Sequence, residues 1–151
     1  MKTIYPYLTY AGAIPFVFCT VCLGLDIQQL PLFGSTQQIL SVYALVIASF
    51  MAGAHWGQHL HIDGDWHPPL AILSNLMAIL LWLGFLILKF NALVTLLISA
   101  FIILLLIDHR LLQQQIISSH YWQTRLVVTT IVIVSLIFAL IFSTIASGTV
   151  S

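Results

Sequence analysis

The sequence predicts an all-α polytopic membrane protein, a compact bundle of five transmembrane helices. Hydrophobic residues make up 61% of the 151-residue chain and charged residues only 5%, whereas about a quarter of the residues of a soluble domain are charged. The apolar residues also fall into runs of the length that the hydrocarbon core of a bilayer requires, about 20 residues each. We therefore expect residues 1–151 to form a single integral membrane domain.

Polar turns separate the apolar runs and define the expected membrane spans, which are residues 5–25, 39–58, 70–88, 92–107 and 125–146. Pro15 lies inside the first span and is expected to kink it, because proline lacks the N–H group that a helix needs. No small-residue cleavage site follows this first run, so we expect it to be retained as a span rather than removed as a signal peptide.

The few basic residues predict the orientation. Five spans place Lys2, Arg110 and Arg125 on one side of the membrane and Lys89 on the other. Because basic residues concentrate on the cytoplasmic side, we expect a cytoplasmic N-terminus and an external C-terminus. The lack of an Arg-rich presequence favours the bacterial inner membrane over the mitochondrial one. The expected partners are membrane lipids, a partner membrane protein or a second copy of the chain; the basic residues form no patch for nucleic acid.

One face of the second expected span carries small residues and ends in histidine. Residues three and four apart share one side of a helix, and this side holds Ser41, Ala44, Ala48, Ala52, His55 and His59. Small residues allow transmembrane helices to approach closely. The pattern therefore predicts a packing face whose terminal histidines make local hydrogen bonds.

The same histidines support an alternative, a site for a divalent metal. His55 and His59 lie one helical turn apart and could bind one ion from the same side. Further ligands could be Asp108, or else His61, Asp63, Asp65, His67 or His109. These residue types suit zinc, but the spacing matches no established motif and no Glu stands beside His55. A haem would need a second axial ligand from elsewhere, such as His120. A membrane-embedded metal-dependent enzyme or cofactor-binding protein therefore stays open.

A second group of ionisable residues surrounds the last interhelical turn. Asp108 ends the fourth expected span and Arg125 opens the fifth, so the two can approach across a helical hairpin. We expect them to pair, because either charge alone is costly near the hydrocarbon edge. Alternatively, Arg110 or Arg125 holds a lipid phosphate or another anion, since a guanidinium binds two oxygens at once. Tyr121 and the following tryptophan are expected to be interfacial anchors.

The interiors of the spans offer little polar chemistry. Ser74 and Asn75 are the most polar pair of the third expected span, and we expect Asn75 to hydrogen-bond to the second span, at Ser41, Tyr43 or Ser49. No acidic or basic residue lies near the middle of any expected span. This argues against a proton or ion pathway, which needs ionisable groups at depth.

Four segments of the chain resemble one known family. They are Tyr10 to Phe16, Ser49 to Gly57 with its Gly-Ala-His-Trp-Gly sequence, Asp108 to Arg110, and Tyr121 to Thr129. They are similar to the transmembrane-protein-69-like family, small five-span proteins of bacteria and mitochondria with no established activity. Where that family tends to read Asp-Arg-Arg, this chain has His109 in the middle position.

The resemblance implies a polar cluster of His55, Trp56, Asp108, Arg110 and Arg125, and it does not extend to the other histidines of the second loop. It brings no established activity. The small-residue faces, the absence of charges near the middle of the spans and the lack of a soluble catalytic domain lead us to expect a non-enzymatic integral membrane protein that acts by binding a lipid or a partner membrane protein.

Overall fold

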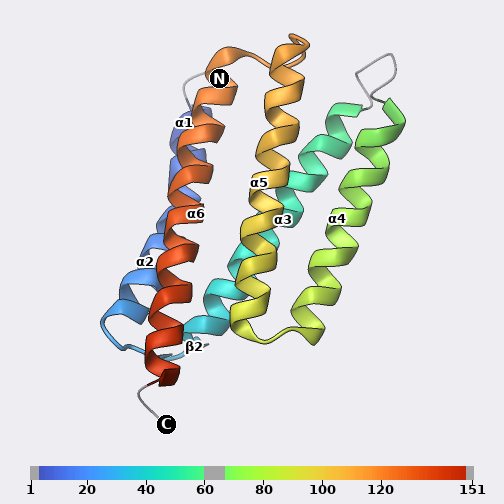
Figure 1. Cartoon of the computed structure of the whole chain (residues 1–151). Helices are drawn as coiled ribbons and strands as arrows, with labels where there is room; N and C mark the ends of the chain where they lie inside the picture. Colours follow the sequence, from blue (N-terminus) through green and yellow to red (C-terminus); the bar gives the residue numbers. More distant parts are fainter. Residues whose placement is uncertain (1–3, 60–66, 149–151) are drawn as a thin grey trace.

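The computed structural model describes residues 4–59 and 67–148, with the backbone alone at residues 4–6, 8, 56, 58, 59 and 67–70. Its described elements are helices joined by short turns, with one small hairpin (Figure 1). The helices are α1 (Ile4–Ala11), α2 (Ile14–Gly24), α3 (Thr36–His59), α4 (His67–Ile87), α5 (Phe90–Gln113) and α6 (Ser119–Gly148), and the hairpin strands are β1 (Gln29–Leu30) and β2 (Gly34–Ser35).

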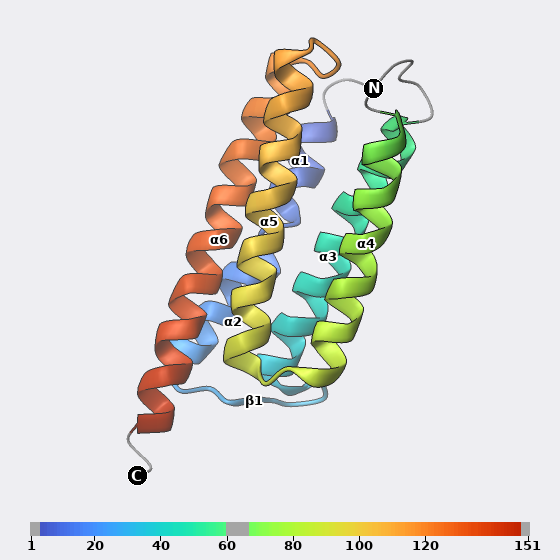
Figure 2. The ribbon, with the colours of Figure 1, turned by 45° about the vertical axis from the view of Figure 1, so that its right-hand side comes forward.

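Helices α3 and α5 contact each other and lie between the other elements. Helices α2 and α6 pack together on one side of this pair, and α4 lies on the opposite side, against both α3 and α5 (Figures 1 and 2). The predicted all-α fold is confirmed. The carboxyl ends of α3 and α5 and the amino end of α6 lie at the same end of the bundle (Figure 1), so residues far apart in the sequence can meet there.

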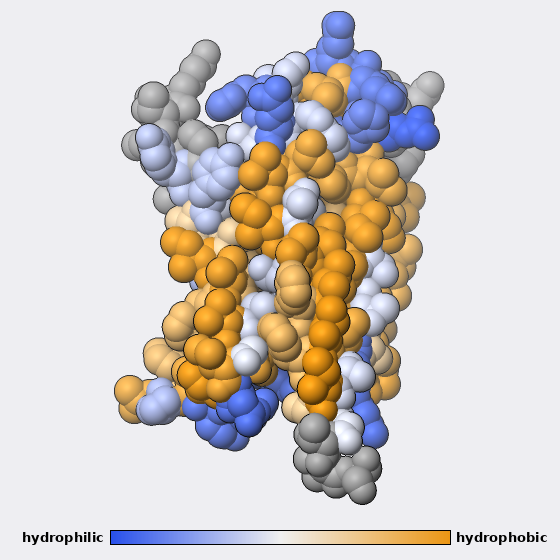
Figure 3. All heavy atoms as spheres, turned by 60° about the vertical axis from the view of Figure 1, so that its left-hand side comes forward, coloured by the Kyte–Doolittle hydropathy of each residue, from blue (hydrophilic) through white to orange (hydrophobic). Residues whose placement is uncertain are grey.

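Three segments are long and apolar enough to cross a membrane: Thr36–His55, Phe90–Gln113 and Ser119–Gly148. Thr9–Gly24 and Ala71–Ile87 are shorter apolar helical segments, and the exact number of five spans stays a prediction. One face of the molecule shows a broad hydrophobic band between hydrophilic regions at the two ends (Figure 3). This distribution suits a bilayer, in which the band contacts hydrocarbon and the ends contact water and headgroups.

The first expected span is divided into two helices rather than kinked at Pro15. Helix α1 ends at Ala11 and α2 begins at Ile14, which places Pro15 in the first turn of α2. Proline is tolerated there because the first N–H groups of a helix have no intrahelical acceptor. The interruption leaves the carbonyl of Gly12 free to accept a hydrogen bond from Tyr43 of α3, at 3.0 Å.

Helices α5 and α6 extend beyond the predicted spans, so the expectation that Asp108 and Arg125 mark helix ends was wrong. Both residues lie inside helices. Helix α5 ends six residues after the predicted boundary, at Gln113 rather than at residue 107, in a motif with Gln115 at φ 59°. There the N–H groups of residues 115 and 116 bond back to the carbonyls of residues 112 and 111, which satisfies the last turn. The Ser118 hydroxyl accepts the Tyr121 N–H at the start of α6, as a helix cap does.

The small-residue face of α3 is buried, as the sequence predicted. Ser41, Ala44, Ala48, Ala52 and His55 are each at most 5% exposed, and α3 packs on α2, α4 and α5. The interhelical bond expected from Asn75 was wrong. Its exposed amide donates to the carbonyl of Ala71 in its own helix, which satisfies the amide without a neighbouring helix.

A tight turn at the opposite end of the bundle joins β1 and β2. Pro31 and Leu32 occupy its two central positions, and the Phe33 N–H bonds to the Leu30 carbonyl at 3.2 Å. Leu32 has φ 73° and is fully exposed. Proline followed by a residue of positive φ is the pattern of a type II turn, a position that normally takes glycine. The turn therefore presents a leucine side chain at a conformational cost.

Candidate functional site

Asp108 binds side chains from two other helices through its two carboxylate oxygens. Oδ1 lies 2.8 Å from Nε2 of His55 on α3, and Oδ2 accepts a hydrogen bond of 3.0 Å from Nε of Arg125 on α6. Nη2 of Arg125 also lies 3.0 Å from Oδ2, but it is not directed along a hydrogen bond. Asp108 is wholly buried, His55 is 2% exposed and Arg125 is 9% exposed. One carboxylate thus connects α3, α5 and α6.

The helical repeat places each of these three residues. Asp108 continues the buried face of α5, which includes Leu104 and Leu111, because steps of three and four stay on one side. His55 is the next member of the small-residue face of α3, where the alanines let α5 approach closely. Arg125 begins the buried face of α6 that continues through Thr129 and Val132. The polar cluster is therefore the continuation of the helix packing faces at one end of the bundle.

The hydrogen bonds assign the charges and the tautomer. A carboxylate only accepts, so His55 must donate its Nε2–H to Oδ1. The other ring nitrogen of His55, Nδ1, is buried and has no hydrogen-bond partner within the described residues, which matches a neutral imidazole with a single N–H. The Arg125 guanidinium also lies 5.9 Å from the centre of the Tyr121 ring, within the range of a cation–π contact.

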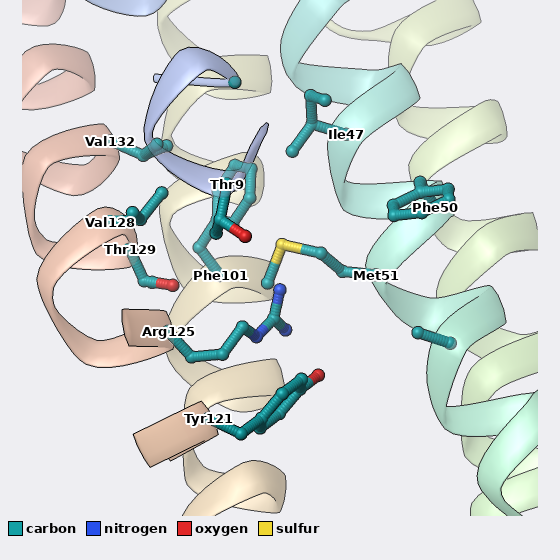
Figure 4. Close-up of a pocket in the computed structure, with 12 residues that line it drawn as sticks. Thr9, Ile47, Phe50, Met51, Phe101, Tyr121, Arg125, Val128, Thr129 and Val132 are labelled. Carbon is teal, nitrogen blue, oxygen red and sulfur yellow. The ribbon is translucent and has the colours of Figure 1, made fainter. Parts of the chain in front are cut away.

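A cavity of about 490 Å³ borders this cluster between α1, α3, α5 and α6. Its described lining is Thr9, Gly12, Ile47, Phe50, Met51, Ala54, Phe101, Tyr121, Arg125, Val128, Thr129 and Val132. Phe50, at its rim, is 74% exposed, so the cavity reaches the lateral surface of the bundle. The guanidinium of Arg125 is directed into it, with the side chains of Thr9, Met51 and Thr129 nearby (Figure 4). The size is that of a small-molecule site.

The guanidinium has unused donors toward this cavity. Of the five N–H groups of Arg125, Nε–H is bonded to Asp108, and the buried Nη2 group has no hydrogen-bond partner within the described part of the chain. A buried donor left without an acceptor costs about 1–3 kcal/mol, and more when it is charged. The arrangement is therefore suited to an acceptor supplied from the cavity.

The structure does not bring every predicted residue into this cluster. Arg110 is exposed and makes no ion pair with any described residue. His109 packs on the Trp122 ring and lies 3.2 Å from Nε2 of Gln113. The side chains of Trp56 and His59 lie outside the described ones.

Among the described residues, no three metal-ligating side chains lie close enough together to hold a metal ion. These residues therefore provide no complete ligand set for the predicted metal site. Its other candidate ligands, His61, Asp63, Asp65 and the side chain of His67, lie outside the described ones.

Sequence reasoning singled out the ionised residues but missed the cavity wall. Thr129 lies one turn beyond Arg125 on α6 and is 3% exposed, and its spacing of four from Arg125 could have marked it as a neighbour. The sequence did not identify Phe50 and Met51 as cavity residues, because an apolar residue within an apolar span looks the same in the sequence whether it faces lipid, core or cavity. Tyr121, expected to be an interfacial anchor, lines the cavity.

Comparison with known proteins identifies the family but no activity. A family model described as "Protein of unknown function (DUF3429)" matches residues 1–141. No curated protein and no solved structure matched the chain. The finer resemblance to transmembrane-protein-69-like proteins stays a prediction. Because the family model covers nearly the whole sequence, the chain belongs to the DUF3429 family of proteins of unknown function.

Proposed function

We propose that this protein is a non-enzymatic integral membrane protein that binds a membrane lipid in the cavity beside Arg125. The apolar wall receives hydrocarbon, and the Nη groups of Arg125 hydrogen-bond to the polar part of the lipid. The observation that carries the proposal is the Arg125 side chain, 11% exposed, whose guanidinium is directed into an apolar cavity with Nη2 lacking a hydrogen-bond partner among the described residues.

The shape of the cavity supports a lipid rather than a water-soluble ligand. Its lining is mostly aliphatic and aromatic, and its rim includes the exposed Phe50 on the side of the bundle. A lipid could enter from the bilayer without crossing water, and burial of each methylene contributes about 0.8 kcal/mol when it comes from water. From within the bilayer that gain is small, so the polar contact to Arg125 must supply the selectivity.

The test is retention of lipid by purified protein. The unchanged protein, Val128→Trp and Gly53→Trp are purified in dodecyl maltoside, and native mass spectrometry counts lipid adducts per chain. Val128 lines the cavity, and a tryptophan there would occupy part of its volume. Gly53 is exposed with nothing within 4 Å of an added Cβ, so Gly53→Trp is a matched control. We expect one retained lipid in the unchanged protein and the control, and little in Val128→Trp. Equal retention in all three would refute the proposal.

A second candidate, a bound metal ion, has one observation in its favour. Metal-ligating histidines commonly donate one ring N–H to a carboxylate, which leaves the other nitrogen for the metal. His55 has this arrangement, with Nε2 at Asp108 and Nδ1 without a partner among the described residues. Elemental analysis tests it: about one zinc per chain, lost in His55→Gln, would favour the metal, and less than about a tenth of a metal per chain would exclude it.

For location, we propose the bacterial inner membrane with a cytoplasmic N-terminus and an external C-terminus, which puts the Arg125 cavity nearer the cytoplasmic leaflet. The support is the distribution of basic residues, with Lys89 at the N-cap of α5 and Arg110 in the last turn of the same helix. Alkaline phosphatase fused after Ser151 should be active. An inactive fusion would reverse this orientation.

A further inference from the structure

The charge balance around Arg125 restricts the kind of lipid that the cavity accepts. Arg125 is the charged residue in the described cavity lining, where the other side-chain polar groups are the uncharged hydroxyls of Thr9, Tyr121 and Thr129. The charge of Arg125 is already balanced, because its Nε and Nη2 atoms both lie 3.0 Å from Oδ2 of the wholly buried Asp108.

His55 adds no charge to this unit. Protonation would place an N–H at Nδ1, where the described residues provide no acceptor and where the atom is buried, at a cost of about 1–3 kcal/mol for the unsatisfied donor. The neutral imidazole avoids that cost and still donates Nε2–H to Asp108. His55, Asp108 and Arg125 together therefore carry a net charge of zero.

An anionic headgroup would bring one unbalanced negative charge into this environment. Burial of a charge without a counter-charge is far more costly than burial of a hydrogen-bonded neutral group. An uncharged carbonyl oxygen accepts the same Nη N–H bonds and adds no charge. The donors of Arg125 are therefore matched to a neutral acceptor, although arginine usually suggests a phosphate or carboxylate ligand.

We infer that the cavity selects an uncharged lipid whose polar end carries an ester or ketone carbonyl, and discriminates against fatty acids and phosphatidic acid. This inference rests on the proposed function, since it names the class of lipid bound at the same site. Thr129 lies in the cavity lining, and its hydroxyl provides an uncharged donor beside the charged guanidinium (Figure 4).

Photo-crosslinking with two matched lipids tests the inference. Diacylglycerol and phosphatidic acid that carry the same diazirine-labelled acyl chain are added at equal mole fraction to protein in dodecyl maltoside micelles, a detergent without carbonyl groups. Labelling is measured on the peptides that contain Met51 and Val128. We expect diacylglycerol to label these peptides roughly tenfold more than phosphatidic acid, as the cost of an unbalanced buried charge implies. Val128→Trp should reduce this labelling and Gly53→Trp should not.

The Asp108→Asn variant reverses the charge argument. It leaves the guanidinium unbalanced, so phosphatidic acid should label this variant at least as strongly as diacylglycerol. If phosphatidic acid labels the unchanged protein as strongly as diacylglycerol, with both sensitive to Val128→Trp, the inference fails and the proposed function stands. If neither label responds to Val128→Trp, the proposed function itself fails. The comparison in the unchanged protein decides the inference even when Asp108→Asn does not fold.

Discussion

Asp108→Asn is the substitution that best tests the role of the buried cluster. The side chain keeps its shape, but the negative charge between His55 and Arg125 is lost. The carboxylate makes a hydrogen bond to each of them, at 2.8 and 3.0 Å, and has no exposed surface. The amide has a single acceptor oxygen, so it can keep one of these bonds, and its NH₂ group faces a donor at the other.

The expected loss follows from these contacts. A hydrogen bond that involves a charged group contributes roughly 1.5–3 kcal/mol, and one of two is lost. Arg125, only 9% exposed, also loses its counter-charge, and removal of one partner from a buried ion pair costs about 3–5 kcal/mol in total. We therefore expect Asp108→Asn to lower the free energy of unfolding by about 3–5 kcal/mol.

The measurement is SDS-induced unfolding in dodecyl maltoside, followed by circular dichroism. Asp26→Asn is the matched control, because Asp26 is exposed and, among the described side chains, accepts a bond from nearby Gln28 alone. It should change stability by less than about 0.5 kcal/mol. Asp108→Asn combined with Arg125→Gln removes the unbalanced charge and should be less destabilised than Asp108→Asn alone. The reasoning is refuted if Asp108→Asn matches the Asp26 control, or if the double variant loses the sum of the two single losses.

Three further predictions concern packing and turns. Gly84→Leu should destabilise the α4–α5 contact by about 1–3 kcal/mol, because an added Cβ would lie 2.3 Å from Cδ2 of Leu96 and the larger leucine must displace that side chain from the core. Gly53→Leu adds a side chain at an exposed position and should not destabilise the protein. Equal unfolding curves for the two variants would contradict this prediction. Thr20→Val removes a 3.0 Å bond to the Ser135 carbonyl and should cost about 0.6 kcal/mol, whereas Thr130→Val, exposed and bonded within its own helix, should cost less in the same assay. Leu32→Gly should raise the free energy of unfolding by about 0.5–1 kcal/mol, because glycine adopts positive φ without strain; Phe33→Gly in the same turn should give no gain, and a loss in Leu32→Gly would show that the exposed leucine stabilises the protein.

The sequence predicted the helical architecture because the thickness and apolar character of a bilayer set the length and composition of the segments that cross it. It also predicted the buried face of α3, since the alanines repeat at helical spacing. The ends of the helices were harder to predict. The last turn of α5 is closed by Gln115 at positive φ. Glycine usually occupies such a position, so the residue type did not indicate that the helix ends there.

The cavity was beyond prediction for a different reason. Charge and spacing pointed to Asp108 and Arg125, but the cavity depends on how much space four elements leave between Ile47, Phe101 and Val132. That space is set by the relative positions of the helices, which apolar residues in a lipid solvent specify only through detailed packing. Asn75 illustrates the same limit of prediction. Its polar side chain suggested a hydrogen bond to another helix, but its own helix provides a nearer carbonyl, that of Ala71.

The order in which the partners of Asp108 are synthesised has a consequence for membrane insertion. His55 precedes Asp108 by 53 residues and Arg125 follows it by 17. The helix that enters the bilayer early thus contributes an uncharged imidazole, and the two full charges belong to the final helical hairpin, α5 and α6. Asp108 and Arg125 can enter the bilayer together as a neutral pair, so neither charge is exposed to hydrocarbon without its counter-charge. The buried carboxylate is thereby compatible with a chain that is inserted from its N-terminus onward.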